Sequence, residues 1–263
     1  MQLGLEGKVA IVGGASRGLG RACAERLARE GVSVVMVSRH AGELDQAAET
    51  IASVAEATVL PVAADQGSSD GVRRIIDEAS CRFGSIDILV NNTGGPPPGL
   101  FEAHDDRAWQ AAFEGLVLSV VRLCRAVIPG MRSRGWGRIV NNTSFTVKEP
   151  ADRLVLSNAL RAAVVGLSKT LSRELAADGV TVNCVCPGAF DTQRLQKLFL
   201  EQADAQGRTP DDVRRAWEAG IPIGRILRPE ELADLIAFLA SDRAAGITGT
   251  SVAIEGGMLH GLL

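Results

Sequence analysis

Residues 8–20 read K-V-A-I-V-G-G-A-S-R-G-L-G, and this stretch decides the fold. The apolar run at 9–12 contains β-branched residues and lies between a lysine and a glycine, which predicts a buried strand. Three glycines follow, Gly14, Gly18 and Gly20, and helical spacing begins at Arg21. A strand, a glycine turn and a helix N-terminus form an anion site, because free N–H groups and the positive end of the helix dipole point at the turn. The spacing is not G-x-G-x-x-G, and a purely structural tight turn is the alternative.

Composition limits the class of protein. The 263 residues, 46% of them hydrophobic, suffice for one sizeable α/β domain but hardly for two. The 28 basic and 31 acidic residues are nearly balanced, so we expect no nucleic-acid partner. Five cysteines and three histidines show no metal-ligand spacing, and Cys184 and Cys186 alternate in a predicted strand, which favours core packing. We find no signal peptide or membrane-spanning run, and we expect a cytoplasmic protein with reduced thiols.

Strand and helix patterns alternate along the whole chain. Strands are predicted over residues 9–12, 32–37, 58–63, 86–90, 138–142, 180–185 and 251–254, and helices from 21 and over 43–57, 69–82, 106–131, 152–177 and 229–240. Helices of this length between strands imply parallel crossovers, so we predict an α/β fold with a doubly wound parallel sheet. No linker or repeat interrupts residues 1–263, so a single domain is expected. Ligands of such sheets bind at the carboxyl ends of the strands.

The motifs at these strand ends resemble those of the short-chain dehydrogenase/reductases, most closely the β-ketoacyl-acyl-carrier-protein reductases. N-N-T-G at 91–94 is similar to the family's N-N-A-G, and P-G at 187–188, T-G at 248–249 and E-G-G at 255–257 follow in the family's order. Gly13 stands where threonine is usual. The resemblance covers residues 8–257 and implies a Rossmann fold with residues 190–222 as a substrate lid. It implies a cofactor site made of Gly14, Ser16, Arg17, Gly18, Leu19, Gly20, Ser38, Arg39, Asp65, Asn92, Thr93, Gly94, Arg161, Pro187, Gly188 and Thr192.

The end of the second predicted strand indicates which nicotinamide cofactor binds. An acidic residue there hydrogen-bonds the ribose 2′-OH of NAD, whereas an arginine accommodates the 2′-phosphate of NADP. This chain has Ser38 and Arg39 at that place, and Arg17 lies in the glycine turn. Two guanidinium groups favour a phosphate dianion, so we predict NADP(H). The alternative is that both arginines are solvated surface residues.

The catalytic positions depart from the family pattern. Family members transfer hydride with a serine, a tyrosine, a lysine and often a helix asparagine. Ser144 matches the serine, but Ser157 stands at the tyrosine position and Arg161 at the lysine position. Leu116 replaces the asparagine, and the chain contains no tyrosine at all. The resemblance therefore implies Ser144, Ser157 and Arg161 as the catalytic set.

Ser157 and Arg161 preserve only part of the family's chemistry. A serine hydroxyl can hydrogen-bond an oxygen but is a poor proton donor, and arginine stays protonated. We therefore expect cofactor binding to survive and proton transfer to suffer. Substitute acids could come from four residues, Lys148, Glu149, Asp152 and His260. The alternative for Lys148 and Glu149 is an exposed charged pair, and for His260 a plain surface position.

Three functions remain open. The first is an NADP(H)-dependent oxidoreductase acting on a carbonyl or alcohol, such as a 3-oxoacyl thioester. The second is another reaction on the same scaffold, as in halohydrin dehalogenases, which carry arginine at the lysine position but lose the glycine turn and keep the tyrosine. The third is an NADP(H)-binding protein without catalysis, acting as a sensor or as a partner subunit. The glycine turn favours the first and third, whereas the missing tyrosine, lysine and asparagine favour the third over the first.

Two helices suggest how the chain assembles. The segments 106–131 and 152–177 resemble the pair through which the family forms tetramers. Their apolar residues exceed what one sheet face is expected to cover, so we predict a homotetramer. These residues are Leu116, Val120, Leu123, Val127, Val164, Leu167 and Leu171. In the lid, Leu195, Leu198, Phe199 and Leu200 suit either a partly hydrophobic ligand or plain helix packing.

Overall fold

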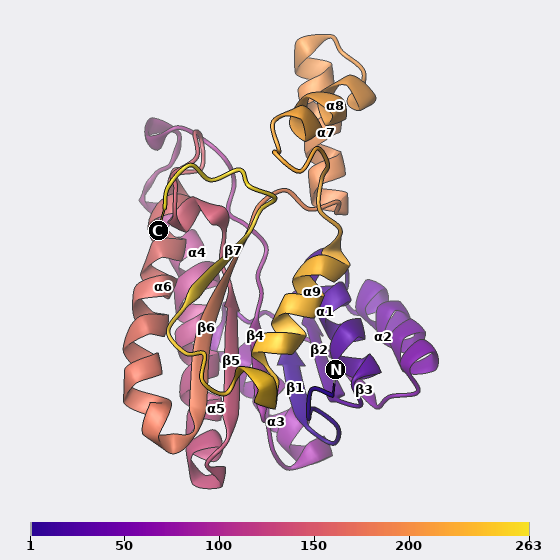
Figure 1. Cartoon of the computed structure of the whole chain (residues 1–263), viewed down its shortest axis with the longest axis vertical. Helices are drawn as coiled ribbons and strands as arrows, with labels where there is room; N and C mark the ends of the chain where they lie inside the picture. Colours follow the sequence, from indigo (N-terminus) through magenta and orange to yellow (C-terminus); the bar gives the residue numbers. More distant parts are fainter. Residues whose placement is uncertain (1, 263) are drawn as a thin grey trace.

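Seven parallel strands form one sheet in the order β3-β2-β1-β4-β5-β6-β7, in a computed structural model that describes residues 2–262 (Figure 1). The strands are β1 (Val9–Val12), β2 (Ser33–Ser38), β3 (Val59–Ala63), β4 (Ile88–Asn91), β5 (Gly137–Asn142), β6 (Val180–Pro187) and β7 (Ser251–Ile254). The strand order reverses between β1 and β4, and a sheet of this kind binds ligands in the crevice at that point. The predicted doubly wound fold is confirmed, and Cys184 and Cys186 are buried in β6 as expected.

Helices cover both faces of the sheet. On one face α1 (Gly18–Arg29), α2 (Ala41–Ala55) and α9 (Pro229–Leu239) bury their apolar residues with β1 and β2 in one core cluster. On the other face lie α3 (Ser69–Phe83), α5 (Ser119–Arg134) and α6 (Val155–Leu175), which share a second cluster with the sheet. α1 and α9 lie side by side, and Arg26 Nε donates to Asp234 Oδ1 at 2.6 Å between them.

The helix predicted over 106–131 is interrupted in the structure. It consists of α4 (Asp106–Phe113), a π-helical turn (Glu114–Leu118) and α5. Within the turn Leu116 is buried, and Ser119 Oγ donates to the carbonyl oxygen of Gly115 at 2.7 Å. A π-helical turn shifts the helical register by one residue, and such turns often mark functional sites. Here it places an apolar side chain at the position of the family's asparagine.

The apolar residues that led us to expect a tetramer are covered within the chain itself. Five of the seven are buried within the chain's own second core cluster, and the other two pack partly buried against that cluster. Because α4 and the π-helical turn pack on α6, more apolar surface is covered than a single sheet face would cover alone. The tetramer therefore stays a prediction that rests on the family resemblance.

Residues 190–222 contain α7 (Gln193–Gln206) and α8 (Pro210–Ala219), which project beyond the carboxyl edge of the sheet (Figure 1). The two helices have a small core of their own, where the Phe199 and Trp217 rings meet edge to face at 5.8 Å. Leu195 is buried there and Leu198 is partly buried, whereas Leu200 is exposed. Helix packing thus accounts for most of the apolar residues of this segment. None of the helices within residues 2–262 is both long and apolar enough to span a membrane.

Candidate active site

The glycine turn joins β1 to α1 at the carboxyl edge of the sheet. Gly14 and Gly18 have φ angles of +57° and +56°, which glycine adopts most readily. A Cβ atom on Gly20 would collide with the Gly14 carbonyl oxygen, so only glycine lets the helix start this close to the strand. At the N-cap of α1, the Arg17 side chain makes no capping hydrogen bond. The N–H groups of the first helical turn are therefore free to bind an anion.

Four other helix N-termini are closed by their own side chains, whereas those of α2 and α6, like that of α1, have no side-chain cap. Four N-cap residues accept a hydrogen bond from the backbone of the helix they start, namely Ser68 in α3, Asp105 in α4, Thr192 in α7 and Thr209 in α8. An N-cap oxygen satisfies one of the N–H groups that a ligand would otherwise bind. The uncapped start of α1 thus combines with the glycine turn to favour an anionic ligand.

Asn92 connects the glycine turn to the middle of the sheet. Its side-chain Nδ2 donates to the carbonyl oxygen of Gly13 at 2.9 Å, and its Oδ1 accepts from Asn142 Nδ2 at 2.8 Å. The carbonyl oxygen of Asn142 in turn accepts from Arg161 Nη1 at 3.0 Å. Three hydrogen bonds therefore join the predicted cofactor turn to the predicted catalytic arginine.

The three predicted catalytic residues lie just after β5 and in the first two turns of α6. Ser157 and Arg161 lie one turn apart in α6 and are 7% and 9% exposed. Ser144 follows β5 and accepts a hydrogen bond from the backbone N of Thr146 at 3.2 Å. Together the three residues supply two hydroxyl groups and one guanidinium group. The set contains no phenol, because the chain has no tyrosine.

Arg161 is a buried cation without an anionic partner. Across residues 2–262, no carboxylate oxygen lies within 4.0 Å of its guanidinium nitrogens, and its one hydrogen bond goes to a neutral carbonyl. Burial, followed by the nearby charge of Arg194, lowers the pKa of Arg161 to about 10. That pKa is still well above neutral pH, so the group remains charged. An uncompensated buried charge is strongly unfavourable for the folded state.

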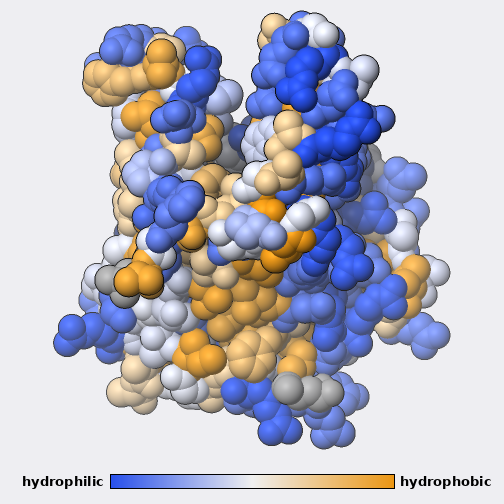
Figure 2. Space-filling model, turned by 45° about the horizontal axis from the view of Figure 1, so that its top comes forward, coloured by the Kyte–Doolittle hydropathy of each residue, from blue (hydrophilic) through white to orange (hydrophobic). Residues whose placement is uncertain are grey.

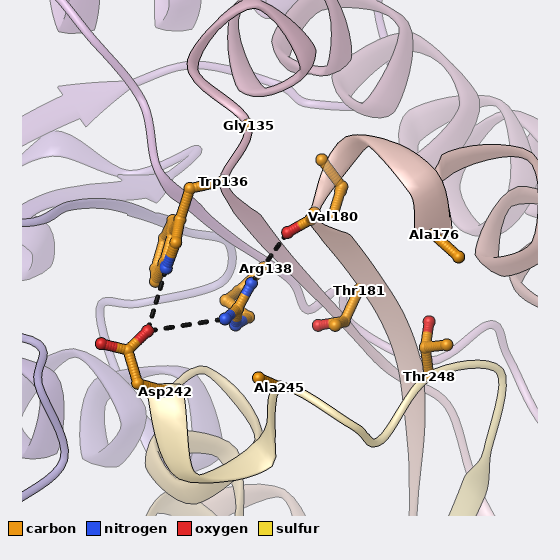
Figure 3. Close-up of a pocket in the computed structure, with 10 residues that line it drawn as sticks. Gly135, Trp136, Arg138, Ala176, Val180, Thr181, Asp242, Ala245 and Thr248 are labelled. Atoms are coloured by element: carbon orange, nitrogen blue, oxygen red, sulfur yellow. Dashed lines mark hydrogen bonds and ion pairs between the residues drawn. The ribbon is translucent and has the colours of Figure 1, made fainter.

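Arg138 shows how the same chain satisfies a buried arginine. It lies at the opposite edge of the sheet beside a hollow of about 410 Å³, lined by the first residues of β5 and β6 (Figure 3). Its Nη1 donates to the carbonyl oxygens of Gly137 at 2.9 Å and Gly179 at 3.1 Å. Its Nη2 lies 3.6 Å from Asp242 Oδ1, and the guanidinium stacks on Trp136. Arg161, by contrast, has a single backbone carbonyl as its partner and no carboxylate within residues 2–262.

The residues expected around the 2′-phosphate come together at the end of β2. Ser38 Oγ donates to Ser16 Oγ at 3.2 Å, which ties β2 to the glycine turn, and Arg39 is exposed beside them. Arg17 faces Glu43 at 3.9 Å, but both side chains are more than half exposed, so this ion pair is weak. Nearby, Asp65 Oδ1 accepts from the backbone N of Gly67 at 2.9 Å.

The remaining predicted cofactor residues border the same crevice. Thr192 lies across from the glycine turn, because a Cβ on Gly18 would be 3.5 Å from its methyl group. Pro187 ends β6, and a Cβ on the next residue, Gly188, would collide with Glu255. Three more residues complete the set, Leu19 in the first turn of α1, and Thr93 and Gly94 after β4.

The proposed substitute acids behave differently from the prediction. Glu149 pairs with His260 and not with Lys148, accepting from its backbone N at 3.0 Å and lying 3.3 Å from its ring Nδ1. These hydrogen bonds lower the pKa of Glu149, so the carboxyl group is ionised at neutral pH and cannot readily donate a proton. Lys148 and Asp152 are exposed.

Two residues of the site escaped the sequence analysis. Asn142 carries the link to Arg161, and Arg194 in the first turn of α7 reaches back to the loop after β4. A Cβ on Gly95 would lie 2.5 Å from Nη1 of Arg194, so the guanidinium rests directly on that glycine. Figure 2 brings the carboxyl edge of the sheet forward and shows a notch between two projecting parts. The right-hand part, which is mostly hydrophilic, holds α7 and α8. No sequence motif singles out Arg194. The local signal for its contact is Gly95, the glycine that directly follows N-N-T-G.

Comparison with known proteins agrees with this geometry. Residues 14–259 match the protein family described as enoyl-(acyl carrier protein) reductase. The chain is 36% identical over 256 residues to the 3-oxoacyl-[acyl-carrier-protein] reductase FabG of Vibrio cholerae, covering 97% of this chain and 99% of that protein. It is 37% identical to a monensin polyketide synthase putative ketoacyl reductase of Streptomyces virginiae, covering 95% and 97%. L-Sorbose reductase from Gluconobacter frateurii, solved with NADPH and L-sorbose, superposes with a TM-score of 0.96 at 36% identity over 100% of both chains.

The two buried arginines yield a stability prediction. We expect Arg161→Met to raise the melting temperature by about 2–6 °C, because it removes an unpaired buried charge. The matched variant Arg138→Met should lower it, since Asp242 and two backbone carbonyls lose their partner. Calorimetry of both variants at neutral pH measures the difference. A loss of stability in Arg161→Met as large as that in Arg138→Met would show that Arg161 is a structural residue.

Proposed function

Because this chain belongs to the short-chain dehydrogenase/reductase family, as its motifs predicted, we propose that it is an NADP(H)-dependent oxidoreductase that transfers hydride to or from a carbonyl or alcohol group. A 3-oxoacyl thioester is the substrate type that the FabG relatives suggest. The observation that carries this proposal is the uncapped N-terminus of α1 above the glycine turn, with Ser38 and Arg39 beside it. Free N–H groups and an arginine are the partners that a pyrophosphate and a 2′-phosphate require.

The residues of the crevice fit NADP(H) in a consistent order. Gly14, Gly18 and the first turn of α1 would hold the pyrophosphate, because the N-cap of α1 has no capping side chain and the glycines carry no Cβ. Ser16, Arg17, Ser38 and Arg39 would hold the 2′-phosphate, and Asp65 would lie toward the adenine. Asn92, Thr93, Gly94, Arg161, Pro187, Gly188 and Thr192 would surround the nicotinamide half, with Leu19 and Gly20 supporting the turn. The domain that we propose spans residues 1–263, with 190–222 as the substrate lid.

The chain's own residues would stabilise charge on the reacting oxygen. The bound nicotinamide supplies or accepts the hydride. Ser144 and Ser157 can each donate a hydrogen bond to the substrate oxygen, and Arg161 provides a fixed positive charge in a buried place, where electrostatic stabilisation is strong. None of the three readily releases a proton at neutral pH, and Glu149 is ionised. We therefore assign proton delivery to water.

A second candidate function follows from the missing phenol. Without the family's catalytic tyrosine and lysine, the chain would bind NADP(H) yet reduce ordinary family substrates poorly. It would then act as a sensor or as the inactive subunit of a partner. The preserved glycine turn supports cofactor binding equally in both candidates. We also propose a cytoplasmic location, which five unbridged cysteines favour.

Cofactor preference tests the phosphate site. We expect NADPH to bind about tenfold or more tightly than NADH, because Arg39 makes a charge-assisted contact with the extra phosphate. Arg39→Asp should narrow or reverse that preference, whereas Arg73→Asp, an exposed change on α3, should leave it intact. Fluorescence titration gives both dissociation constants. Equal constants for NADPH and NADH in the unmodified protein contradict the assignment.

Restoring the family's residues tests the catalytic set. Ser157→Tyr combined with Arg161→Lys should raise the turnover of an acetoacetyl thioester by about 100- to 10,000-fold, the usual contribution of general acid catalysis. Ser157→Tyr alone should gain less, because arginine cannot relay a proton. Glu149→Gln should leave the rate of the unmodified protein unchanged. Steady-state NADPH oxidation measures all four proteins, and a rate normal for enzymes in the unmodified protein would refute the view that its site is impaired.

Assembly is a separate prediction. We propose a homotetramer in which α4, α5 and α6 meet their counterparts, on the family resemblance alone. Light scattering at micromolar concentration should then give the mass of four chains. A mass of one chain under these conditions would exclude the tetramer.

A further inference from the structure

Two arginines lie near the loop after β4. Arg161 extends from α6 to the carbonyl oxygen of Asn142, 3.0 Å away. Arg194 extends from the first turn of α7 and rests on Gly95, where a Cβ would lie 2.5–2.8 Å from its guanidinium atoms. The two groups are close enough for the charge of Arg194 to lower the pKa of Arg161. Arg161, which is buried, is joined to this loop through Asn142 and Asn92, whereas Arg194, which is exposed, contacts it at Gly95.

Nothing in the described part of the chain neutralises these two cations. Within residues 2–262, neither forms an ion pair with a carboxylate. Three acidic residues of the segments around the crevice have other partners. Asp191 binds Arg214 at 3.1 Å, Glu149 binds His260, and Glu255 accepts from the backbone N of Leu259 at 3.2 Å. These three carboxylates therefore do not neutralise Arg161 or Arg194, and the exposed Asp152 forms no ion pair with either of them.

Folded proteins rarely keep such an arrangement without a purpose. A buried charge loses its hydration, and a like charge beside it adds repulsion, so the folded state is disfavoured until an anion arrives. A guanidinium group presents several N–H donors in a plane that matches a carboxylate or phosphate. Arg161 makes one hydrogen bond to the protein and is nine-tenths buried. Its remaining N–H donors are therefore available to a ligand in an environment of low dielectric constant.

We infer that Arg161 and Arg194 form an anion-binding subsite, and that the substrate of this protein carries a carboxylate or phosphate group close to its reacting carbonyl. The inference rests on the proposed oxidoreductase function. The phosphates of the cofactor are the other source of the same chemistry, but the glycine turn and α1 serve them at the end of β1. The two arginines lie beyond Asn92, beside β5 and the lid, where the reacting end of a substrate would lie.

Equilibrium binding tests the subsite without any turnover. The unmodified protein is saturated with NADP⁺, which cannot reduce a ketone, and titrated by calorimetry with acetoacetate and with methyl acetoacetate. The ester differs from acetoacetate by one methyl group, which removes the charge of the carboxylate. Acetoacetate should bind about tenfold or more tightly than the ester, because hydrogen bonds to charged groups are the stronger ones. Equal affinities, or no saturable binding of acetoacetate, would overturn the inference.

Substitutions in α6 and α7 identify the residues that cause the charge-selective binding. Arg194→Gln should weaken acetoacetate binding about tenfold or more and leave the ester unchanged, and Arg161→Gln should do the same. Lys197→Gln, an exposed cation one turn further along α7, is the matched control and should change neither ligand. Loss of acetoacetate affinity in Lys197→Gln as large as in Arg194→Gln would mean that general charge attraction, and not a subsite, is responsible.

A cofactor titration separates the two sources of anion. The dissociation constant of NADPH should stay within about twofold in Arg194→Gln, because the subsite faces the substrate. If NADPH binding falls as much as acetoacetate binding, the cofactor's phosphates occupy the arginines and the inference is overturned. Charge-selective binding by a protein that shows no NADPH oxidation would uphold the subsite and refute the oxidoreductase function.

Discussion

The amide side chain of Asn92 holds the site together. It donates to Gly13 at 2.9 Å and accepts from Asn142 at 2.8 Å, so β1, β4 and β5 are fixed to one another at the edge where ligands bind. The amide reaches the turn only because two glycines leave room, since a Cβ on Gly14 or Gly20 would lie 2.7 Å from Nδ2. The glycines that make an anion site are thus also required by an internal hydrogen bond. An unsatisfied amide in this place would cost about 1–3 kcal/mol.

A second series of hydrogen-bonded side chains starts one residue earlier in β4 and β5 and fixes α6. Asn91 Nδ2 donates to Asn141 Oδ1 at 2.7 Å, which the parallel register of β4 and β5 places opposite it. Asn141 Nδ2 donates to Ser168 Oγ at 2.7 Å, within α6. Because both strands and the helix are tied by buried hydrogen bonds, the backbone that carries Ser157 and Arg161 has little freedom. The altered residues therefore stand on the same rigid frame that would hold the family's own.

Local signals made the strands, the glycine turn and most helices predictable, because a β-branched run or a glycine acts on its immediate neighbours. The same reasoning misjudged Leu116, since counting apolar residues does not reveal how much surface the helices cover on one another. Glu149 was assigned the wrong partner because His260 is 111 residues away in the sequence. Arg194 was missed for the same reason: its contact with Gly95 exists only after the sheet has brought the two loops together.

The packing of α1 on α9 has a consequence for how the protein is made. Arg26 and Asp234 meet at 2.6 Å although 208 residues separate them, and Leu27 shares its core cluster with Ile236. At ordinary rates of translation the ribosome needs about 10–40 s to add those residues. During that interval the apolar face of α1 lacks the helix that covers it. The nascent chain is therefore most exposed to aggregation, and most dependent on chaperones, shortly before its synthesis is complete.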